Sequence, residues 1–452
     1  MTASLPMTAT ASTATERAAL ERELAQELGV ELGLEPGASG SASSPTEAAI
    51  PPSAPARPAV RLIDVAFDLL VAGGTSSAQE SALRALEAGG HDPKNRGFTL
   101  QNTELTFSGV VDPYLRGDAN IVLQIDEDGE TAIELEEAYL TTLSLPGHLQ
   151  LKGGHFYNAF GRQNAVHPHG WEFVDAPVVS TRLLGPDGLR NPGLQVSWLT
   201  PLPFFLELTA SVQNARGETA ASFSGVAGEE LAGRPLRDFD VRSLLDFVYL
   251  ARLRTSFDPT EALTLVLGFS GLYGPNATGR DAQTQIFGAD LYAKWKPLTS
   301  VQGWPFFAWQ TEAMVRRYEV ASLVLGRADG LATDDVTAVP GDVLDDWGLY
   351  TQLVVGLWRP WVVAVRYDYA AGQESDFDLA SLGLDRAYAT REDSTRDRRH
   401  RFSAALTYYP TEFSKVRLQY AHDRAAFLEP GSANSVYLQA EITFGAHGAH
   451  AF

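Results

Sequence analysis

A strict alternation of apolar and polar side chains near the C-terminal end constrains the fold of this chain most. Three runs, at 401–409, 415–420 and 436–444, repeat the pattern. Their apolar positions are Phe402, Ala404, Leu406, Tyr408, Val416, Leu418, Tyr420, Val436, Leu438, Ala440, Ile442 and Phe444. Because side chains on a β-strand alternate between its two faces, each run has one apolar face and one polar face. In a water-soluble sheet the apolar face needs a covering layer, whereas in a membrane barrel it faces lipid.

Sixteen segments carry a strand signal, with an error of about two to four residues at each end. They are residues 60–70, 97–110, 113–125, 131–144, 148–156, 192–200, 203–213, 244–257, 261–273, 284–297, 304–320, 346–358, 360–370, 399–409, 414–424 and 434–445.

The connections between these segments alternate in length. Short turns, most of them with proline, lie at 111–113, 145–147, 200–203, 258–261, 297–303, 359–360 and 410–412. Long connections lie at 71–96, 157–191, 214–243, 321–345 and 371–398. Short turns at one end and long loops at the other are typical of outer-membrane barrels. The pattern predicts an all-β fold, a transmembrane antiparallel β-barrel of about sixteen strands over 59–452, with both termini on the periplasmic side.

Composition excludes several classes of function. The chain has 452 residues and a net charge of −21, which argues against a nucleic-acid partner. It contains no cysteine, which excludes thiol catalysis, zinc–thiolate sites and disulfides. No apolar run reaches the roughly 18–20 residues of a membrane-spanning helix. Because no nucleophile motif is visible either, an enzyme is not expected.

Residues 1–58 differ from the rest of the chain. Residues 16–34 predict a short helix with leucines four residues apart, and residues 37–58 have the Ser-, Ala- and Pro-rich composition of a flexible linker. Residues 1–12 do not combine a basic segment with an apolar one, so no secretory signal is predicted there.

Several predicted strands carry charged residues on their polar face. These residues are Arg116, Asp118, Arg252, Arg254, Arg366 and Asp368. Charges are expensive in lipid but acceptable in a water-filled lumen, so we expect them to line the lumen.

Aromatic residues lie near many strand ends. They are Trp198, Phe257, Tyr273, Trp295, Trp304, Trp347, Trp358, Trp361, Tyr408 and Tyr409. Barrels carry girdles of such rings at the lipid–water boundary, and ordinary core packing is the alternative for some of them.

The connection at 157–191 is unlike the other long loops. It contains the apolar residues Phe160, Trp171, Phe173, Val178, Val179, Leu183 and Leu184, which predict that it packs against other parts of the protein. Its charged and imidazole side chains are Arg162, His167, His169, Glu172, Asp175, Arg182, Asp187 and Arg190. An inward fold would make these residues a pore constriction that sets selectivity; a cap or a subunit contact is the alternative. The three arginines could form a local anion filter despite the acidic total charge.

Histidines raise the question of a metal. His155, His167 and His169 are close in sequence, and His447 and His450 lie near the end of the chain. Imidazole is a common zinc ligand, and Glu172 or Asp175 could complete a site. The spacing is not that of a known zinc motif, so no cofactor is predicted, and zinc at His155, His167 and His169 stays open.

The stretch from Gly153 to Leu189, followed by Pro192 to Pro203, resembles a family of porin-like barrels. The stretch reads GGHFYNAFGRQNAVHPHGWEFVDAPVVSTRLLGPDGL and then PGLQVSWLTPLP, and the ending GAHGAHAF is also similar. These barrels are often labelled zinc-regulated TonB-dependent outer membrane receptors. More distantly, the layout looks like the sixteen-stranded phosphate-selective (polyphosphate) porins, in which the third loop forms the constriction. The resemblance implies a passive or gated porin-like barrel.

We therefore expect an outer-membrane channel for passive diffusion of small hydrophilic solutes or ions. Its expected partners are outer-membrane lipid, these solutes or ions, the barrel-assembly machinery and, as an open alternative, two further copies in a homotrimer. The alternatives for function are a metal-linked or substrate-specific uptake receptor, a non-conducting structural or adhesive barrel, and a soluble β-rich binding protein.

Overall fold

The computed structural model describes residues 63–125, 129–231, 234–326, 336–373 and 396–445. The chain divides into Met1–Ala59 and Val60–Phe452, and every described residue lies in the second part. The predicted helix at 16–34, the linker at 37–58, His447 and His450 lie outside the described residues.

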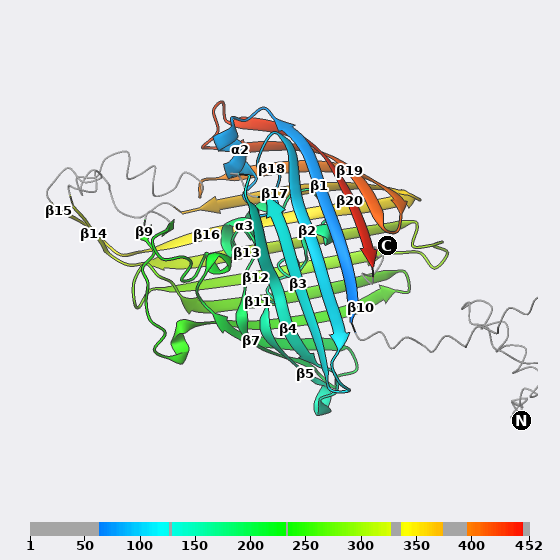
Figure 1. Ribbon diagram of the computed structural model, residues 1–452, viewed down its shortest axis with the longest axis horizontal. Coiled ribbons are helices and arrows are strands. Elements are labelled where there is room, and N and C mark those ends of the chain that lie inside the picture. Colours follow the sequence, from blue (N-terminus) through cyan, green and yellow to red (C-terminus); the bar gives the residue numbers. More distant parts are fainter. Residues whose placement is uncertain (1–62, 126–128, 232–233, 327–335, 374–395, 446–452) are drawn as a thin grey trace, which may run out of the picture. The chain divides into compact units, whose positions relative to one another are not determined.

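Sixteen antiparallel strands close into one barrel, as Figure 1 shows. They are β1 (Asp64–Ser76), β2 (Gly97–Val110), β3 (Leu115–Ile125), β4 (Thr131–Thr142), β5 (Leu149–Tyr157), β6 (Arg190–Leu199), β7 (Phe205–Asn214), β10 (Phe247–Thr260), β11 (Leu263–Pro275), β12 (Gln283–Trp295), β13 (Phe306–Val320), β16 (Asp342–Trp358), β17 (Trp361–Gly372), β18 (Arg399–Thr411), β19 (Ser414–Ala425) and β20 (Ser432–Gly445). Each strand pairs with the next in this order, and β1 closes the barrel on β20. The prediction of an all-β, sixteen-stranded antiparallel barrel is confirmed.

The predicted strand boundaries need one substantial correction, at β1. This strand was expected at 60–70 but runs from Asp64 to Ser76, through Gly73 and Gly74. Glycine weakens an isolated strand signal, but pairing with both β2 and β20 holds the backbone here.

Apolar side chains point outward and polar ones inward, as the alternation requires. On β18, Phe402 is 46% exposed while its neighbour Arg401 is 1% exposed. On β20, Leu438 is 55% exposed and Gln439 is 1% exposed. The barrel is therefore an apolar cylinder around a polar interior, which is the inverse of a soluble protein.

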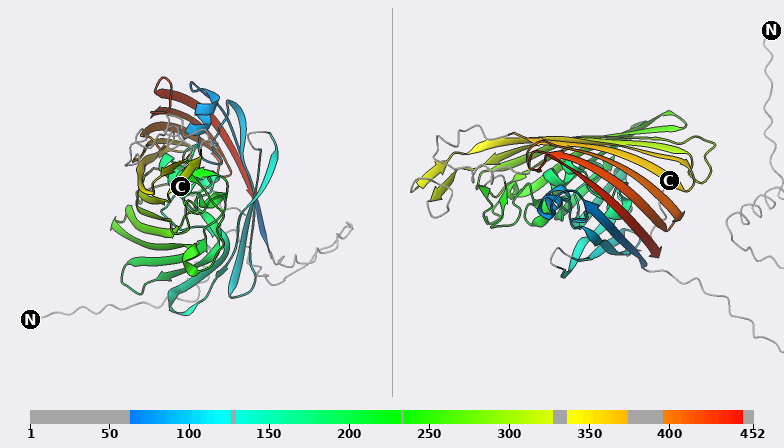
Figure 2. Two further views of the ribbon diagram at one scale, coloured as in Figure 1. Left: turned by 90° about the vertical axis from the view of Figure 1, so that its left-hand side faces the viewer. Right: turned by 90° about the horizontal axis from the view of Figure 1, so that it is seen from above.

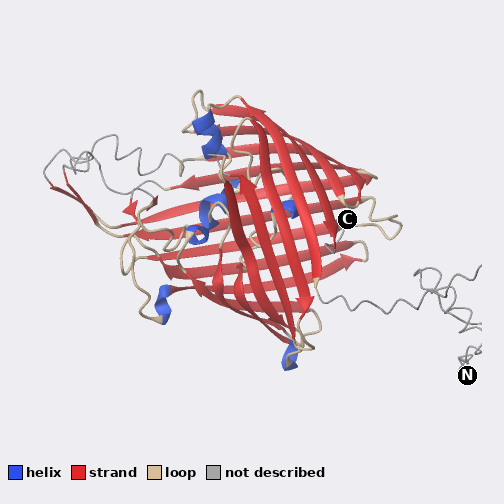
Figure 3. Ribbon diagram, viewed as in Figure 1, coloured by secondary structure: helices blue, strands red, loops and turns tan. Residues whose placement is uncertain are grey.

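The connections separate by length, and the two described ends lie at the short-turn end of the barrel. Ala66, near the start of β1, pairs with Gly445, at the end of β20. The long connections hold α2 (Glu80–Leu86), α3 (Val178–Leu184), η2 (Pro168–Gly170), η3 (Glu218–Ala220) and η4 (Leu244–Asp246), whereas η1 (Pro146–His148) lies in a short turn. They also hold two small sheets, β8 (Glu230–Leu231) with β9 (Arg234–Pro235), and β14 (Leu323–Gly326) with β15 (Val336–Val339). Figure 3 shows strands forming the wall and short helices in the connections.

No helix in the described parts of the chain is long and apolar enough to cross a membrane.

Most of the predicted girdle residues lie exposed on the outer wall, but Tyr273, Trp304 and Tyr409 do not. Trp198, Trp295, Trp347, Trp358, Trp361, Phe257 and Tyr408 are exposed. Trp304 is 6% exposed and packs edge-on against Phe306, in a cluster that also holds Phe173 and Tyr409. The expectation of a girdle position was wrong for Trp304 and Tyr409, because these rings pack against Phe173 of the 157–191 connection.

A second apolar cluster forms where this connection meets the wall. Phe160, Val179 and Leu183 pack with wall residues such as Leu250 and Met314. Figure 2 (left) looks at the barrel from its long-loop end and shows green segments inside the ring of strands. Part of the interior of this barrel is thus filled by protein.

Candidate functional site

The connection at 158–189, which we call the lumen loop, joins β5 to β6. It contacts wall strands that lie nearly half-way round the barrel from β5 and β6. At one position the backbone amides of Arg162 and Gln163 donate to Glu312 of β13, at 2.9 and 2.6 Å. At another, Asp175 pairs with Arg366 of β17. Between these two positions, His167 contacts carboxylates of β2 and β4. The loop therefore spans the interior between walls on opposite sides.

The lumen loop is held in place by an apolar helix. Pro177 precedes α3, where its fixed φ suits the first turn, and Gly185 ends the helix with a φ of 104°. Of the seven residues of α3, Val178, Val179, Ser180, Leu183 and Leu184 are buried. A helix buried on nearly every side must lie inside the protein rather than on its surface.

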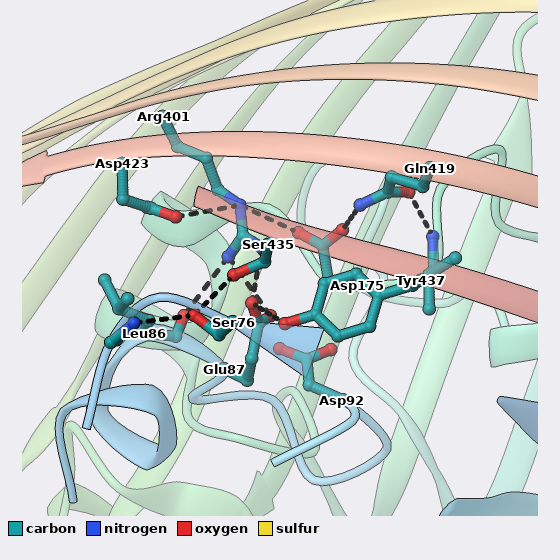
Figure 4. Close-up of polar contacts among 12 residues, drawn as sticks. Ser76, Leu86, Glu87, Asp92, Asp175, Arg401, Gln419, Asp423, Ser435 and Tyr437 are labelled. Carbon is teal, nitrogen blue, oxygen red and sulfur yellow. Dashed lines mark hydrogen bonds and ion pairs between the residues drawn. The ribbon is translucent and has the colours of Figure 1, made fainter. Parts of the chain in front are cut away.

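Asp175 is the centre of a buried ion-pair network, drawn in Figure 4. Its carboxylate pairs with Arg366, accepts a hydrogen bond from Gln419, and lies 3.5 Å from Nε of Arg401. Burial alone would raise the pKa of Asp175, but the two guanidinium groups outweigh burial and hold this pKa below its usual value. Asp175 is therefore an ionised anchor of the lumen loop.

The first long connection contributes two further carboxylates to this network. Glu87 pairs with Arg401 and accepts a hydrogen bond from the Tyr437 hydroxyl at 2.9 Å. Asp92 accepts hydrogen bonds from the backbone amides of Gly89 and Ala176, both at 2.8 Å. Burial, with the nearby charges of Glu87 and Asp175, raises the pKa of Asp92 to about 7. Figure 4 shows both side chains below Arg401, on the segment that follows α2.

A second group gathers His167 and His169 with three glutamates, and we call it the His–Glu cluster: Glu104, Glu136, Glu137, His167 and His169. Nδ1 of His167 lies 2.9 Å from Glu136 and 3.3 Å from Glu104, and its Nε2 lies 3.0 Å from Glu137. Nδ1 of His169 lies 3.2 Å from the other oxygen of Glu104. Burial alone would lower the pKa of His167. The surrounding carboxylates, Glu136 first among them, outweigh burial and raise this pKa well above its usual value.

A β-bulge brings two consecutive glutamates of β4 into this cluster. Asn120 of β3 pairs with Glu137, and the next residue, Ile121, pairs with Leu135, so Glu136 is the extra residue. Side chains normally alternate along a strand, but a bulge re-aims one of them. As a result Glu136 and Glu137 are both buried, at 0% and 6% exposure.

His155, which the sequence placed with His167 and His169, does not join them. Among the described residues, the group whose potential ligand atoms lie within 4.8 Å of one another is Glu104, His167 and His169. His155 is the neighbour of Phe156, which is fully buried, so strand alternation directs His155 to the outer face. The trio that the sequence left open therefore does not come together, because proximity in sequence does not take account of the face of the strand.

The other predicted lumen-loop residues lie at separate places. Arg190 is fully buried and contacts Glu134, the Tyr157 hydroxyl at 2.7 Å and the Asp187 carbonyl at 2.9 Å. Arg182 donates to the carbonyls of Arg396 and Asp397.

Two more side chains of the loop complete this set. The guanidinium of Arg162 stacks 3.8 Å from the ring centre of Tyr292. Glu172 is half-buried and interacts electrostatically with Lys294 and Lys415.

The predicted lumen-lining charges divide into two groups. Arg252 and Arg366 are buried and contact the lumen loop, Arg252 at the Ala159 carbonyl and Arg366 at Asp175. Arg366 also pairs with Asp368, which is fully buried and accepts from the Val178 amide. In contrast, the pairs Arg116–Asp118 and Arg254–Glu207 do not reach the loop and have half-exposed arginines. They lie toward the short-turn end, because Arg116 is the second residue of β3 and Arg254 lies in the second half of β10.

A cavity of about 480 Å³ opens at the long-loop end. Its ionisable lining residues are His91, Asp92, Lys94, Asp187, Glu218 and Glu229, so acidic groups predominate. Nε2 of His91 lies 3.9 Å from Asp187 and 4.0 Å from Glu136. His91 therefore connects the cavity to the His–Glu cluster.

Sequence reasoning missed the wall residues that hold the loop, among them Glu104, Glu136, Glu312 and Arg401, and also Glu87 of the first long connection. A signal was available in β4, where Glu134, Glu136 and Glu137 put three carboxylates on or beside one strand face. Carboxylates that become buried inside the barrel are expensive unless paired, so such a cluster marks candidate partners for a loop with basic side chains.

Comparisons with known proteins place the chain in a family and support the fold. No family model matches the chain. An uncharacterized protein of Aquifex aeolicus (strain VF5) is 32% identical over 399 residues, which cover 83% of this chain and 76% of that protein. The outer membrane channel DcaP of Acinetobacter baumannii has a TM-score of 0.50 at 13% identity, over 85% of this chain and 99% of that one. An anion-selective porin from Comamonas acidovorans has a TM-score of 0.47 at 7% identity, over 84% of this chain and 99% of that one. The chain thus belongs to the same family as the Aquifex aeolicus protein, and its fold is a porin-like, sixteen-stranded antiparallel β-barrel.

Proposed function

We propose that the protein is an outer-membrane, porin-like channel for small hydrophilic solutes or ions, with the lumen loop as its constriction. The observation that carries the proposal is the closed barrel with an apolar outside, a charged inside and a loop tied across it. A closed sheet satisfies its own backbone hydrogen bonds, so it can cross lipid, and charged side chains are tolerated only where the interior is polar.

The lumen loop narrows the path that solutes can take through the barrel. Residues at its anchors, such as Asp175 and Arg366, are at most 2% exposed, and the apolar residues of α3 occupy space that an open porin would leave to water. Solutes therefore pass beside the loop or when it moves, and groups lining that path select among them.

Local charge favours cations at the long-loop entrance. The cavity there presents Asp92, Asp187, Glu218 and Glu229 against Lys94. The arginines of the loop, in contrast, are engaged: Arg190 with Glu134, and Arg162 with Tyr292. The structure thus gives no support to an anion filter built from these arginines, and we expect cation preference.

Single-channel recording in a planar bilayer tests the proposal. The purified full-length protein is expected to give stable steps of low conductance, with a reversal potential in a salt gradient that indicates cation preference. A matched variant, Asp187→Asn with Glu218→Gln, reduces the charge of the entrance and is expected to weaken that preference without closing the channel. Protein that inserts stably but never conducts would rule out the channel.

A non-conducting structural barrel is the second candidate. It is favoured by the anchoring of the lumen loop to two sides of the barrel wall. The two candidates differ in one measurable property, the permeability of proteoliposomes to small ions. A soluble β-rich protein would in turn be released from washed membranes without detergent, whereas we expect the protein to stay in the membrane fraction. In this proposal the short-turn end and both termini face the periplasm.

A further inference from the structure

The His–Glu cluster has the composition and spacing of a metal site. Glu104, His167 and His169 each offer a ligand atom, and these atoms lie within 4.8 Å of one another. Nδ1 of His167 lies 3.3 Å from one carboxylate oxygen of Glu104, and Nδ1 of His169 lies 3.2 Å from the other. In a tetrahedral site with bonds of about 2.0–2.1 Å, neighbouring ligand atoms are about 3.3 Å apart. The spacing in the protein therefore already suits an ion placed between the three groups.

A fourth ligand and an outer shell are also present. Glu136 lies 2.9 Å from Nδ1 of His167 and can supply a further carboxylate oxygen. Nε2 of the same ring lies 3.0 Å from Glu137. A histidine that binds a metal through one nitrogen commonly donates its other N–H to a carboxylate, which fixes the ring. His167 has both partners in the required places.

The two imidazoles are held before any ligand arrives. His167 and His169 flank Pro168, which is buried and opens the turn η2. The ring of His167 packs edge-on against Tyr157, with centroids 5.5 Å apart, and Lys415 donates to the carbonyl of His169. A preorganised ligand set loses little conformational entropy when it binds an ion.

The choice of ligands restricts the kind of ion. Two imidazole nitrogens and carboxylate oxygens suit zinc and its neighbours in the first transition row, whereas calcium and magnesium take oxygen ligands. The chain contains no cysteine, so it offers no thiolate ligand to ions that prefer sulfur. A divalent cation also matches the excess of carboxylates, three glutamates for two histidines.

The cluster has an approach from the long-loop end. The acidic cavity there contains His91, which lies 3.9 Å from Asp187 on the cavity side and 4.0 Å from Glu136 on the cluster side. Carboxylate and imidazole groups thus follow one another from the entrance to the cluster. Successive sites of this kind let an ion leave one site as it is bound by the next.

The geometry points to a binding site for a divalent transition-metal ion at Glu104, His167 and His169, with Glu136 as fourth ligand and Glu137 as the outer-shell partner. Binding follows from the cluster alone. That the ion is cargo, which enters by the acidic cavity, rests on the proposed channel function.

Titration of the purified full-length protein with ZnCl₂ by calorimetry tests the binding. His167→Gln with His169→Gln is expected to weaken zinc binding at this site by at least about 100-fold, and Glu137→Gln by about 10–100-fold. The control His422→Gln, which removes a ring on β19 that contacts Asn434 of β20, should bind zinc as the parent does. A second control, His447→Gln with His450→Gln, tests the C-terminal histidines.

A spectroscopic measurement keeps the test independent of how well the variants fold. Four-coordinate Co²⁺ in the parent protein should give intense visible absorption that Zn²⁺ abolishes. If Co²⁺ gives no such absorption, or if the double variant binds zinc as tightly as the parent, the cluster is an ion-pair network only and the site is wrong.

Conductance recorded on the same preparations separates the two proposals. A barrel whose conductance is unaffected by zinc would contradict the proposal that the metal ion is transported, and it would leave the proposed channel function intact. A barrel that binds zinc at the cluster but never conducts overturns the channel and the cargo, and leaves the binding site. If both proposals hold, micromolar zinc should block or slow the current of the parent and not that of His167→Gln with His169→Gln.

Discussion

The carboxylate of Asp175 lies 3.5 Å from Nε of Arg401, and both side chains are at most 1% exposed. Asp175 belongs to the lumen loop and Arg401 to wall strand β18, so the pair ties the loop to the barrel. Arg401 in turn pairs with Glu87 of the first long connection. One guanidinium therefore joins two loops and the wall.

Removal of Asp175 is expected to loosen this tie. Asp175→Ala leaves Arg366 and Arg401 buried without their shared partner, which typically costs about 3–5 kcal/mol. We expect a lower temperature for loss of the heat-modifiable folded band on gels, and larger or noisier conductance steps. The control Glu207→Ala breaks the half-exposed pair with Arg254 and should cost no more than about 1 kcal/mol. Equal stability of the two variants would contradict the anchoring role of Asp175.

Stability should depend on pH through Asp92. Its pKa is about 7 in the folded protein and about 3.9 in an unfolded chain, so the folded state binds more protons between these values. The free energy of unfolding should therefore fall as pH rises from about 4 to 7, and Asp92→Asn should make this part of the profile flatter.

Asp246 provides a control, because its pKa is shifted in the opposite direction to that of Asp92. It is half-buried, and the backbone amides of Arg242 and Ser243 lower its pKa, so its contribution to stability is lost as pH falls through that lowered value. Asp246→Asn should leave the pH 4–7 slope unchanged in urea unfolding measured at each pH. A slope that Asp92→Asn does not alter would show that Asp92 does not titrate in this window.

The apolar packing of α3 predicts a large effect of truncation. Leu183 is fully buried between the lumen loop and the wall, so Leu183→Ala should destabilise the protein by about 2–5 kcal/mol. Leu244→Ala, at a position 75% exposed, should change stability by no more than about 0.5 kcal/mol. Urea unfolding followed by tryptophan fluorescence measures both, and similar midpoints would mean that α3 does not pack in the interior.

The outer face predicts a response that distinguishes a membrane barrel from a soluble one. Leu438 and Leu202 are similarly exposed, at 55% and 47%, but Leu438 lies mid-strand in β20 and Leu202 in a short turn. An arginine facing the centre of the bilayer costs about 2–4 kcal/mol, and little near the interface. Leu438→Arg should therefore reduce folding into lipid vesicles, whereas Leu202→Arg should not. In a soluble protein the two variants would behave alike.

The fold was predictable because its signal is local. The alternation around Phe402 and Leu438 assigns each face from immediate neighbours, and the strands and their outward sides followed from it. The exceptions depend on other parts of the chain: Trp304 lies near a strand end, but it turns inward because Phe173 of the lumen loop packs there.

The candidate site was less predictable because its contacts are long-range. Arg366 and Asp175 are 191 residues apart in sequence, and nothing near either residue indicates the pairing. The bulge that brings Glu136 beside Glu137 shifts the register by one residue, and alternation alone assigns one of the two to the wrong face. His155, in contrast, could have been set aside from alternation alone, because its neighbour Phe156 faces the interior.

The bridging of the barrel by the lumen loop has a mechanical consequence. A closed sheet of strands is a hoop that resists stretching along its hydrogen bonds but bends easily, so an empty ring can become oval. The lumen loop acts as a spoke, fixed to β2 and β4 at one end and to β17 and β18 at the other. The two ends differ in chemistry, since one is held by imidazole and carboxylate and the other by guanidinium and carboxylate. A ligand that competes for imidazole can release the first end, and the ring then loses this brace and can become oval.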